Sequence, residues 1–481
     1  MTWNSKMAET TDFETTTTVV RKRRRRYRIA MVCDFFYPRM GGVEMHIWSL
    51  SQHLIRLGHK VIVITHSYAN RKGVRYMPDN LKVYYCPFIP MTDQDILPTF
   101  TATFPLWRSI MIREGIEIVH THQATSVMAN ESVVYAAALG LPSVFTDHSL
   151  FQFDDLAGVI LNRVLETALG ATLNAAICVS HACRDNLILR AKLDPKKIDV
   201  IPNAVDPSKF TPAPESEVET VRNPTGENRI KVVVVSRLVY RKGVDLLVGI
   251  VPKICDLLPQ VDFIVGGDGN KLLSLQEMVE KENIQDRVTF LGAVPHKNVA
   301  SVLRQGHVFL NCSLTESFCI AILEAASCGL LVVSTNVGGV PEVLEPDMIV
   351  LCDPNVEALV QGVQTAIERQ EGEGALDPWD AHRRIERMYS WHRVAVQTVQ
   401  VYDRIIRDKP TTFLERLRSH MRLGGFSGIV ACALIFYIEL WIRFVEWMYP
   451  AETIDVVWDL VPPVSDESTA RVLNGRKEVL M

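Results

Sequence analysis

The sequence predicts an α/β protein of two doubly wound domains, followed by a helix long enough to cross a membrane. Short apolar runs alternate with amphipathic stretches along most of the chain, which is the pattern of parallel sheets covered by helices. The length of 481 residues exceeds one typical domain, and 48% hydrophobic residues can fill two cores. The third observation is the segment 423–442, which carries a single charge.

The first domain is expected to hold a parallel sheet whose strands are joined by helices. A Gly41-Gly42 loop follows its first strand and precedes a helix expected over 43–57. Peptide N–H groups in such a loop face a phosphate, although a plain tight turn uses the same glycines. The strands are expected over 27–34, 61–65, 81–86, 116–120, 143–146, 175–180 and 199–201.

Histidines follow two of these strands, at the edge where doubly wound sheets bind ligands. His120 and His122 come after one strand, and Asp147-His148 come after another. A histidine at a strand end is more often structural than functional, so position alone leaves both roles open.

The second domain is expected after the segment 212–228, whose Pro, Glu and Asn content indicates a linker. Arg237 and Lys242 stand five residues apart, just past a strand expected over 231–236. An arginine fork and a mobile lysine charge at a strand end can bracket a diphosphate, while an ordinary surface pair is the plain alternative.

Three more strands of this domain are expected over 261–265, 288–291 and 307–310. The first of them leads to a second glycine turn at Gly266, Gly267 and Gly269. This turn lacks the full G-x-G-x-x-G pattern, so it gives no argument for NAD.

The stretch 311–343 has the pattern of a loop, a helix, a buried strand, a glycine turn and a second helix start. Ser317 is expected to cap a helix that begins near Phe318, with Glu316 and Glu324 at its two ends. Eight helical residues would separate these acids by roughly 12 Å, which suits two ends of an elongated ligand. Two solvated helix acids are the plain alternative.

These residues resemble the retaining GT-B glycosyltransferases that use nucleotide-sugars. The shared pattern is E-x7-E, a small-residue turn, a buried strand and G-G-x-P-E, together with S-R-L-x-x-x-K-G from Ser236. The non-glycine residues Ser317 and Cys319 beside Phe318 narrow the match to the catalytic subunits of phosphatidylinositol N-acetylglucosaminyltransferase, a GT4-type family of glycosylphosphatidylinositol (GPI) anchor synthesis. The resemblance covers roughly residues 29–450 and implies two Rossmann-like domains facing a cleft.

The resemblance also implies roles for the residues named above. Arg237 and Lys242 would neutralise the leaving diphosphate, Glu316 and Glu324 would hold sugar and ribose hydroxyls, and His148 would lie near the donor sugar. Catalytic roles are expected for Glu316, His148, Arg237 and Lys242. Donor binding is expected for Gly41, Gly42, Gly267, Arg237, Lys242, Ser317, Phe318 and Glu324.

The implied reaction moves N-acetylglucosamine from UDP-N-acetylglucosamine to phosphatidylinositol with retention of configuration, as the first step of GPI-anchor biosynthesis. UDP-N-acetylglucosamine is a co-substrate, and no cofactor is expected. Asp93 and Asp95 formally fit a D-x-D metal pair, but relatives stabilise the diphosphate with basic side chains, so no essential metal is expected. The alternatives are the same fold acting on another lipid or glycan, or a non-catalytic membrane scaffold.

Charge and cysteine content limit the compartment and the partners. The formal net charge of −4 gives no reason to expect nucleic acid as a partner. The ten cysteines form no C-x-x-C pair, so reduced core thiols of a cytosol-facing protein are expected. The basic run 21–26 lies in a polar arm expected to be disordered, and it is a solvated arm, a contact to anionic lipid, or a nuclear-import or nucleic-acid-binding segment.

A transmembrane helix is predicted over 423–447, with a buried or interfacial amphipathic helix as the alternative. Basic residues precede this segment and acids follow it, so both large domains are expected in the cytosol and the tail in the lumen. The basic residues are Arg404, Arg407, Lys409, Arg416, Arg418 and Arg422, and the acids are Glu452, Asp455 and Asp459.

The resemblance places the chain in the endoplasmic reticulum membrane, in a complex with the other subunits of the transferase. Glu439, Arg443 and Glu446 are a plausible docking surface for these subunits. The predicted limits are 1–28 for the basic arm, 29–211 for the acceptor-side domain, 212–228 for the linker, 229–385 for the donor-nucleotide domain, 386–422 for crossing and juxtamembrane helices, 423–447 for the membrane helix and 448–481 for the tail.

Overall fold

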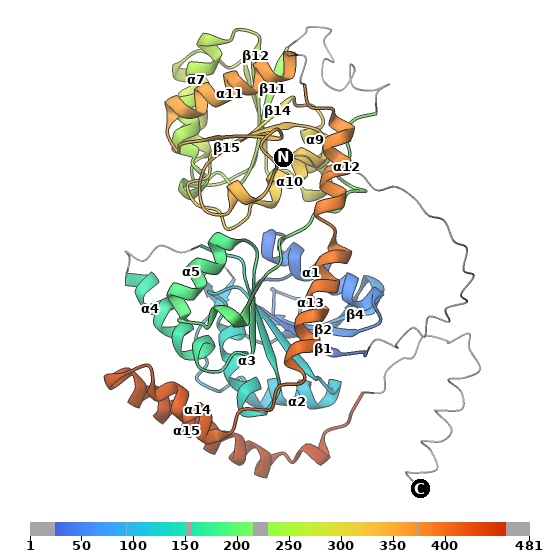
Figure 1. The fold of residues 1–481 in the computed structure, drawn as a ribbon, viewed down its shortest axis with the longest axis vertical. Coiled ribbons are helices and arrows are strands. Elements are labelled where there is room, and N and C mark those ends of the chain that lie inside the picture. Colours follow the sequence, from blue (N-terminus) through green and yellow to red (C-terminus); the bar gives the residue numbers. More distant parts are fainter. Residues whose placement is uncertain (1–24, 93, 151–155, 215–228, 373–374, 458–481) are drawn as a thin grey trace, which may run out of the picture.

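The computed structural model describes residues 25–92, 94–150, 156–214, 229–372 and 375–457. Two sheets flanked by helices form two lobes, which are stacked along the long axis of the molecule (Figure 1). Most of the predicted arm, most of the linker, Asp93 and the tail from residue 458 lie outside the described residues.

The first lobe has an eight-stranded sheet in the order β10-β9-β8-β7-β1-β2-β4-β3. All its strands pair in parallel except β3, which is antiparallel to β4 at the edge. The strands are β1 Arg28–Val32, β2 Lys60–His66, β3 Gly73–Met77, β4 Leu81–Cys86, β7 Ile118–His122, β8 Ser143–Asp147, β9 Ala175–Cys178 and β10 Ile198–Val200.

The sequence prediction missed β3 because its residues are exposed at the sheet edge and have no buried apolar face. A small hairpin, β5 Pro90–Thr92 with β6 Asp95–Ile96, was also missed. The helices of this lobe are α1 Gly42–Arg56, α2 Phe104–Glu114, α3 Val127–Ala138, α4 Leu156–Leu165 and α5 His181–Ala191.

The second lobe has a six-stranded sheet in the order β13-β12-β11-β14-β15-β16, with every pair parallel. Its strands are β11 Ile230–Val235, β12 Val261–Gly266, β13 Val288–Gly292, β14 Val308–Asn311, β15 Leu331–Thr335 and β16 Ile349–Cys352. Its helices are α7 Val244–Leu257, α8 Leu272–Lys281, α9 His296–Leu303, α10 Ile320–Ser327, α11 Val356–Glu371 and α12 Pro378–Met388. The predicted pair of doubly wound sheets is therefore confirmed.

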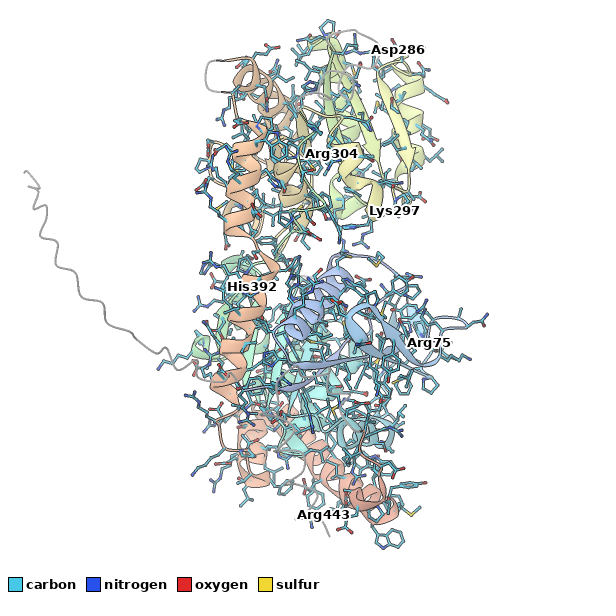
Figure 2. All side chains as sticks on the ribbon, turned by 90° about the vertical axis from the view of Figure 1, so that its right-hand side faces the viewer. Arg75, Asp286, Lys297, Arg304, His392 and Arg443 are labelled. Atoms are coloured by element: carbon cyan, nitrogen blue, oxygen red, sulfur yellow. The ribbon has the colours of Figure 1, made fainter. Side chains whose placement is uncertain are left out.

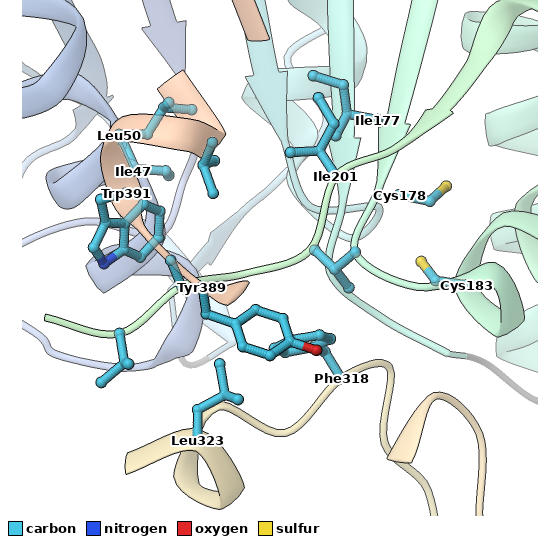
Figure 3. Packing of buried hydrophobic residues seen from close by; sticks show 14 of the residues in the cluster. Ile47, Leu50, Ile177, Cys178, Cys183, Ile201, Phe318, Leu323, Tyr389 and Trp391 are labelled. Atoms are coloured by element: carbon cyan, nitrogen blue, oxygen red, sulfur yellow. The ribbon is translucent and has the colours of Figure 1, made fainter. Parts of the chain in front are cut away.

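One hydrophobic core runs across both lobes. After α12 the chain returns to the first lobe as α13 Trp391–Ile405, which packs beside α1 (Figure 1). Tyr389, between these two helices, packs edge-on against Phe318 of the second lobe (Figure 3). The ten cysteines are free and eight of them are buried, as expected for reduced core thiols.

The C-terminal part forms a helical hairpin of α14 Phe413–Met421 and α15 Gly425–Met448. In the part of the chain that the structure describes, α15 is the helix long and apolar enough to cross a membrane, which is consistent with membrane association. The hairpin lies under the first lobe, at the end away from the second lobe (Figure 1).

Candidate active site between the two lobes

A lysine–glutamate pair connects two loops of the second lobe. Lys242 ends the short helix that follows β11, and its Nζ donates a hydrogen bond to the carboxylate of Glu316. Ser313 donates to the same carboxylate over 2.8 Å. Both charged side chains are largely buried, with 21% of Lys242 and 11% of Glu316 exposed, so their geometry is well defined.

Gly243 allows these two loops to approach each other. Its φ of +69° lies in the left-handed region, and a Cβ atom added there would lie 1.7 Å from the carbonyl oxygen of Cys312. Any side chain at this position would separate Lys242 from the loop after β14.

Two arginines bring more positive charge to the same turn. Arg237 is exposed just past β11, at the predicted position. Burial and the positive charge of Arg237 lower the pKa of Arg241, so the two guanidinium groups are close enough to repel each other. Three cations therefore face one carboxylate, and this surplus suits a diphosphate. Arg241 was not predicted, although it stands directly before Lys242.

Gly267 packs against the backbone at the end of β11. A Cβ atom at Gly267 would lie 1.8 Å from the carbonyl oxygen of Ser236, at a φ of +143°. The glycine is thus required by the close approach of two backbones beside Arg237.

The start of α10 differs from the prediction. The helix begins at Ile320, and Cys319 before it has a φ of +71°. Ser317 does not cap the helix, because its hydroxyl donates to the carbonyl oxygen of His148 over 2.5 Å. Glu316 therefore lies in a loop and not at a helix end, so the expected spacing of the two acids along one helix is wrong.

Phe318 points away from this site. Its ring is 2% exposed and packs in the core against Tyr389. Only the backbone of Phe318 is thus available to a ligand, whereas the prediction assigned the residue to donor binding.

Glu324 lies within α10 and faces the start of α9. It accepts a hydrogen bond from His296 Nε2 over 3.1 Å, and 12% of its side chain is exposed. His296 was not predicted, because a histidine after a proline at a helix start has no distinct pattern. A ligand held by Glu324 would also meet this imidazole.

Four histidines gather at the carboxyl edge of the first sheet. His148 Nε2 lies 3.3 Å from His122 Nδ1, and the ring of His46 lies edge-on to His148 with the ring centroids 4.5 Å apart. His120 Nδ1 lies 2.6 Å from the hydroxyl of Tyr402 in α13. His120 and His122 are thus structural neighbours of His148, the predicted catalytic residue.

Burial keeps these imidazoles neutral. It lowers the pKa of His46 to about 4 and that of His120 to about 3, and it holds the pKa values of His122 and His148 well below the ordinary value. A neutral His148 can donate or accept one hydrogen bond to a sugar hydroxyl, but it adds no positive charge.

The same histidines have the chemistry of a metal site. Ligand nitrogens of His46, His122 and His148 all lie within 4.8 Å of one another. Neutral imidazoles bind zinc at roughly 2.0 to 2.1 Å. The contact between His122 and His148 shows that this group also satisfies itself by hydrogen bonding.

The glycine loop of the first lobe meets the second lobe. Gly42 begins α1, and a Cβ atom there would lie 3.9 Å from Ile320 at the start of α10. The carboxylate of Glu44 lies beside Gly41, 2.6 Å from the position of an added Cβ atom. Because this negative charge opposes a second anion, diphosphate binding falls mainly to the cations of the second lobe.

A second carboxylate holds the two lobes together. Glu342 of the second lobe accepts hydrogen bonds from the backbone N–H groups of His181 and Ala182, over 2.7 and 2.9 Å. These groups begin α5 of the first lobe, where the helix dipole favours a negative charge. The preceding Gly339 donates its N–H to the carbonyl of Glu316 over 2.9 Å, so this interlobe contact is connected to the Lys242 pair.

Two family models match the chain. One, described as PIGA (GPI anchor biosynthesis), matches residues 66–155, and the other, described as glycosyl transferases group 1, matches residues 216–378. The phosphatidylinositol N-acetylglucosaminyltransferase subunit of this type from Arabidopsis thaliana is 48% identical over 90% of this chain and 95% of its own length. Its Homo sapiens counterpart is 47% identical over 91% of this chain and 89% of its own length. The chain belongs to this PIGA family.

Solved structures show the fold of this PIGA family member. Sucrose-phosphate synthase from Thermosynechococcus elongatus matches with a TM-score of 0.66 at 20% identity, over 79% of this chain and 99% of that one. Anabaena HepE in complex with UDP matches with a TM-score of 0.63 at 18% identity, over 78% of this chain and 100% of that one. The fold is therefore that of a GT-B glycosyltransferase, as predicted.

Proposed function

We propose that this protein transfers N-acetylglucosamine from UDP-N-acetylglucosamine to phosphatidylinositol, with retention of configuration. The transfer would be the first step of GPI-anchor biosynthesis. The names of the relatives give the sugar and the acceptor, and their coverage of nearly the whole chain supports the assignment. The alternatives with another acceptor, or with a scaffold that binds no donor, are outcomes of the test below.

The observation that carries the proposal is the cation cluster around Glu316. Lys242, Arg237 and Arg241 lie on one turn after β11, and Lys242 is oriented by a carboxylate. Positive charge held in place beforehand stabilises the charge that grows on a departing UDP, and it needs no reorganisation during the reaction. An ammonium and two guanidinium groups thus supply leaving-group stabilisation from protein residues alone.

The remaining residues would position the sugar and exclude water. Glu316 has a second carboxylate oxygen for a sugar hydroxyl, and neutral His148 is joined through its carbonyl to Ser317 of the other lobe. Contact between the lobes brings both residues to one place and shields the donor from hydrolysis. The departing diphosphate would accept the proton of the inositol hydroxyl.

Radiolabel transfer tests the proposal. Membranes containing the full chain and its partner subunits are supplied with labelled UDP-N-acetylglucosamine, with and without phosphatidylinositol. Labelled lipid that forms only with phosphatidylinositol is the expected result. Label in another lipid would move the activity to that acceptor, and absence of UDP-sugar binding by the purified protein would indicate a scaffold.

Metal removal has a predicted outcome as well. We expect transfer to be unchanged by EDTA, because the cation cluster supplies the charge that a metal would otherwise provide. Activity with and without EDTA, in buffer treated to remove metals, is the measurement. A loss that Zn²⁺ restores would contradict this and would make His46, His122 and His148 a working metal site.

We propose that the protein works at the endoplasmic reticulum membrane with both lobes in the cytosol, together with other subunits of the transferase. Relatives named as subunits support the complex. The basic residues before α15 support the cytosolic side. The single crossing and the lumenal tail stay predictions of the charge pattern, and protease protection of a C-terminal tag tests them.

A further inference from the structure

We infer that α15 lies flat along the first lobe, and that its outer face and an apolar ridge of that lobe rest together in one leaflet of the bilayer. The ridge is defined by the exposed residues Ile89, Met91, Leu97 and Phe100. The inference deepens the proposed membrane attachment, because it replaces a crossing helix with a surface that carries the lobe.

The first part of α15 packs on α14. Arg416 of α14 is 5% exposed and donates to Glu439 over 3.0 Å. Cys432 donates through its thiol to the carbonyl of Leu417 over 3.4 Å. Helix α14 in turn rests on the first lobe, where its buried His420 meets the backbone of Thr167. The start of α15 is thereby fixed to the first lobe.

The last part of α15 contacts the first lobe directly. The Tyr437 hydroxyl lies 3.2 Å from that of Thr101, and Trp441 Nε1 donates to the carbonyl of Thr101 over 3.2 Å. Val445 is buried in the same cluster as Trp107 of α2. These contacts continue to the end of the helix.

Arg108 of α2 makes the strongest of these contacts. Its guanidinium is 2% exposed, forms an ion pair with Glu446 and donates to the carbonyl of Tyr449 over 3.0 Å. Separating α15 from the lobe would leave a buried charge without these partners, which is costly. Beyond the helix, Val457 N–H donates to the carbonyl of Arg113 over 2.8 Å.

Contacts at both ends of α15 argue against a crossing. A helix that crosses a hydrocarbon core of about 30 Å carries its two ends to opposite sides. Tyr437 to Val457 would then be far from Thr101 and Arg108, on the side away from the lobes. Both ends of α15 instead lie on the same lobe, so they lie on the same side of the bilayer.

The outer face of α15 is apolar enough to rest in lipid. Its exposed side chains recur at the helical period, from Phe426 at 80% exposed to Trp447 at 75%. Those between them are Ile429, Val430, Leu434, Phe436, Leu440 and Phe444. The opposite face is buried, with Gly428, Ala431, Ile435, Ile438 and Val445. The exposed cations Arg418, Arg422 and Arg443 suit anionic headgroups beside this face.

The ridge extends this face toward the candidate active site. Phe100 is 77% exposed and precedes Thr101, which contacts α15. Farther along the same segment, Gln94 donates to Glu44 over 2.7 Å, beside the Gly41–Gly42 loop. Apolar side chains thus run from the lipid-facing helix to the loop that meets the second lobe, along the path that the acyl chains of a lipid acceptor would need.

Photo-crosslinking in intact microsomes tests the placement of the helix. Benzoylphenylalanine at Tyr437 is expected to crosslink within the chain to residues near Thr101, as mapped by mass spectrometry. The same group at Leu440, which is 53% exposed, is the matched control and should label lipid. Labelling of lipid alone from both positions would overturn the inference, and neither result depends on transferase activity.

A paired glycosylation reporter tests the side of the tail. An acceptor site fused after Met481 should stay unglycosylated, and it should become glycosylated when an additional membrane span is inserted between the protein and the reporter. The reverse pair of results would show that α15 crosses the bilayer.

The ridge has its own test. Leu97→Asp with Phe100→Asp should reduce binding of the full chain to phosphatidylinositol vesicles at least about tenfold, because two charges would enter the leaflet. Val74→Asp on β3, where the residue is also exposed, is the control and should bind normally. Normal binding of the double variant, with an unchanged melting temperature, would remove the ridge from the proposal.

Discussion

At the scale of single residues, the candidate site depends on charges that neighbouring groups hold in place. Glu316 and Ser313 fix the position of Lys242, and Gly243 permits the backbone contact that brings them together. The four buried histidines have the opposite character, because burial keeps them neutral. The site thus combines a cationic side in the second lobe with an uncharged polar side in the first.

Lys242→Ala should lower kcat at least about 100-fold, because it removes one preorganised charge from the leaving diphosphate. The measurement is label transfer at saturating donor. Lys253→Ala is the matched control, since Lys253 pairs with Glu357 on the surface, and it should be fully active. Full activity of the Lys242 variant would exclude the lysine from the mechanism.

The buried His120 should make stability dependent on pH. Its pKa falls to about 3, against about 6.5 in the unfolded chain, so the unfolded chain binds more protons between these values. The free energy of unfolding therefore decreases as the pH falls below about 6.5. We expect the melting temperature of His120→Asn to depend less steeply on pH between 6.5 and 5 than that of the wild type. Equal slopes would show that His120 takes its proton without unfolding.

At the scale of elements, backbone conformation decides where α10 starts and what the turn after β11 can hold. Cys319 has a positive φ, so the chain turns once more before the helix begins. The turn frees Ser317 for the other lobe and leaves Glu316 in a loop. The local pattern of a capping serine before an apolar run was outweighed by this tertiary contact.

Gly243→Ala tests the close approach of the two loops. The new Cβ atom would collide with Cys312, so we expect a loss of roughly 1 to 3 kcal/mol of stability, together with reduced transfer. Gly292→Ala is the control, because Gly292 has a similar φ of +64° but no atom within 4 Å of an added Cβ. Comparable melting temperatures for the two variants would contradict the role of the contact.

At the scale of the whole molecule, the site exists only where the two lobes meet. Glu342 at the start of α5 and Ser317 at the carbonyl of His148 connect the lobes, and α13 packs against α1 after the chain returns. Figure 2 shows α13, with His392 near its start, extending along the first lobe below the second. These connections place cations and histidines from opposite lobes around one position.

Glu342→Gln should loosen the contact between the lobes. The amide keeps the shape but loses the charge that favours the start of α5, so we expect a larger radius of gyration by small-angle scattering and weaker donor binding. Glu345→Gln is the control, since Glu345 pairs with Arg384 on the surface of the second lobe. An unchanged radius of gyration and unchanged donor affinity would show that the other interlobe contacts suffice.

The sequence by itself determined the two doubly wound sheets, the family, and Arg237, Lys242 and Glu316 as residues near a diphosphate. These are local features, because apolar runs, glycine turns and strand ends depend on neighbours along the chain. The role of Ser317, the burial of Phe318, and the contributions of Arg241, His296 and Glu342 were decided only by tertiary structure. Each depends on a partner distant in sequence, and the same holds for α15, whose apolar length permits a crossing while its contacts place both ends on one lobe.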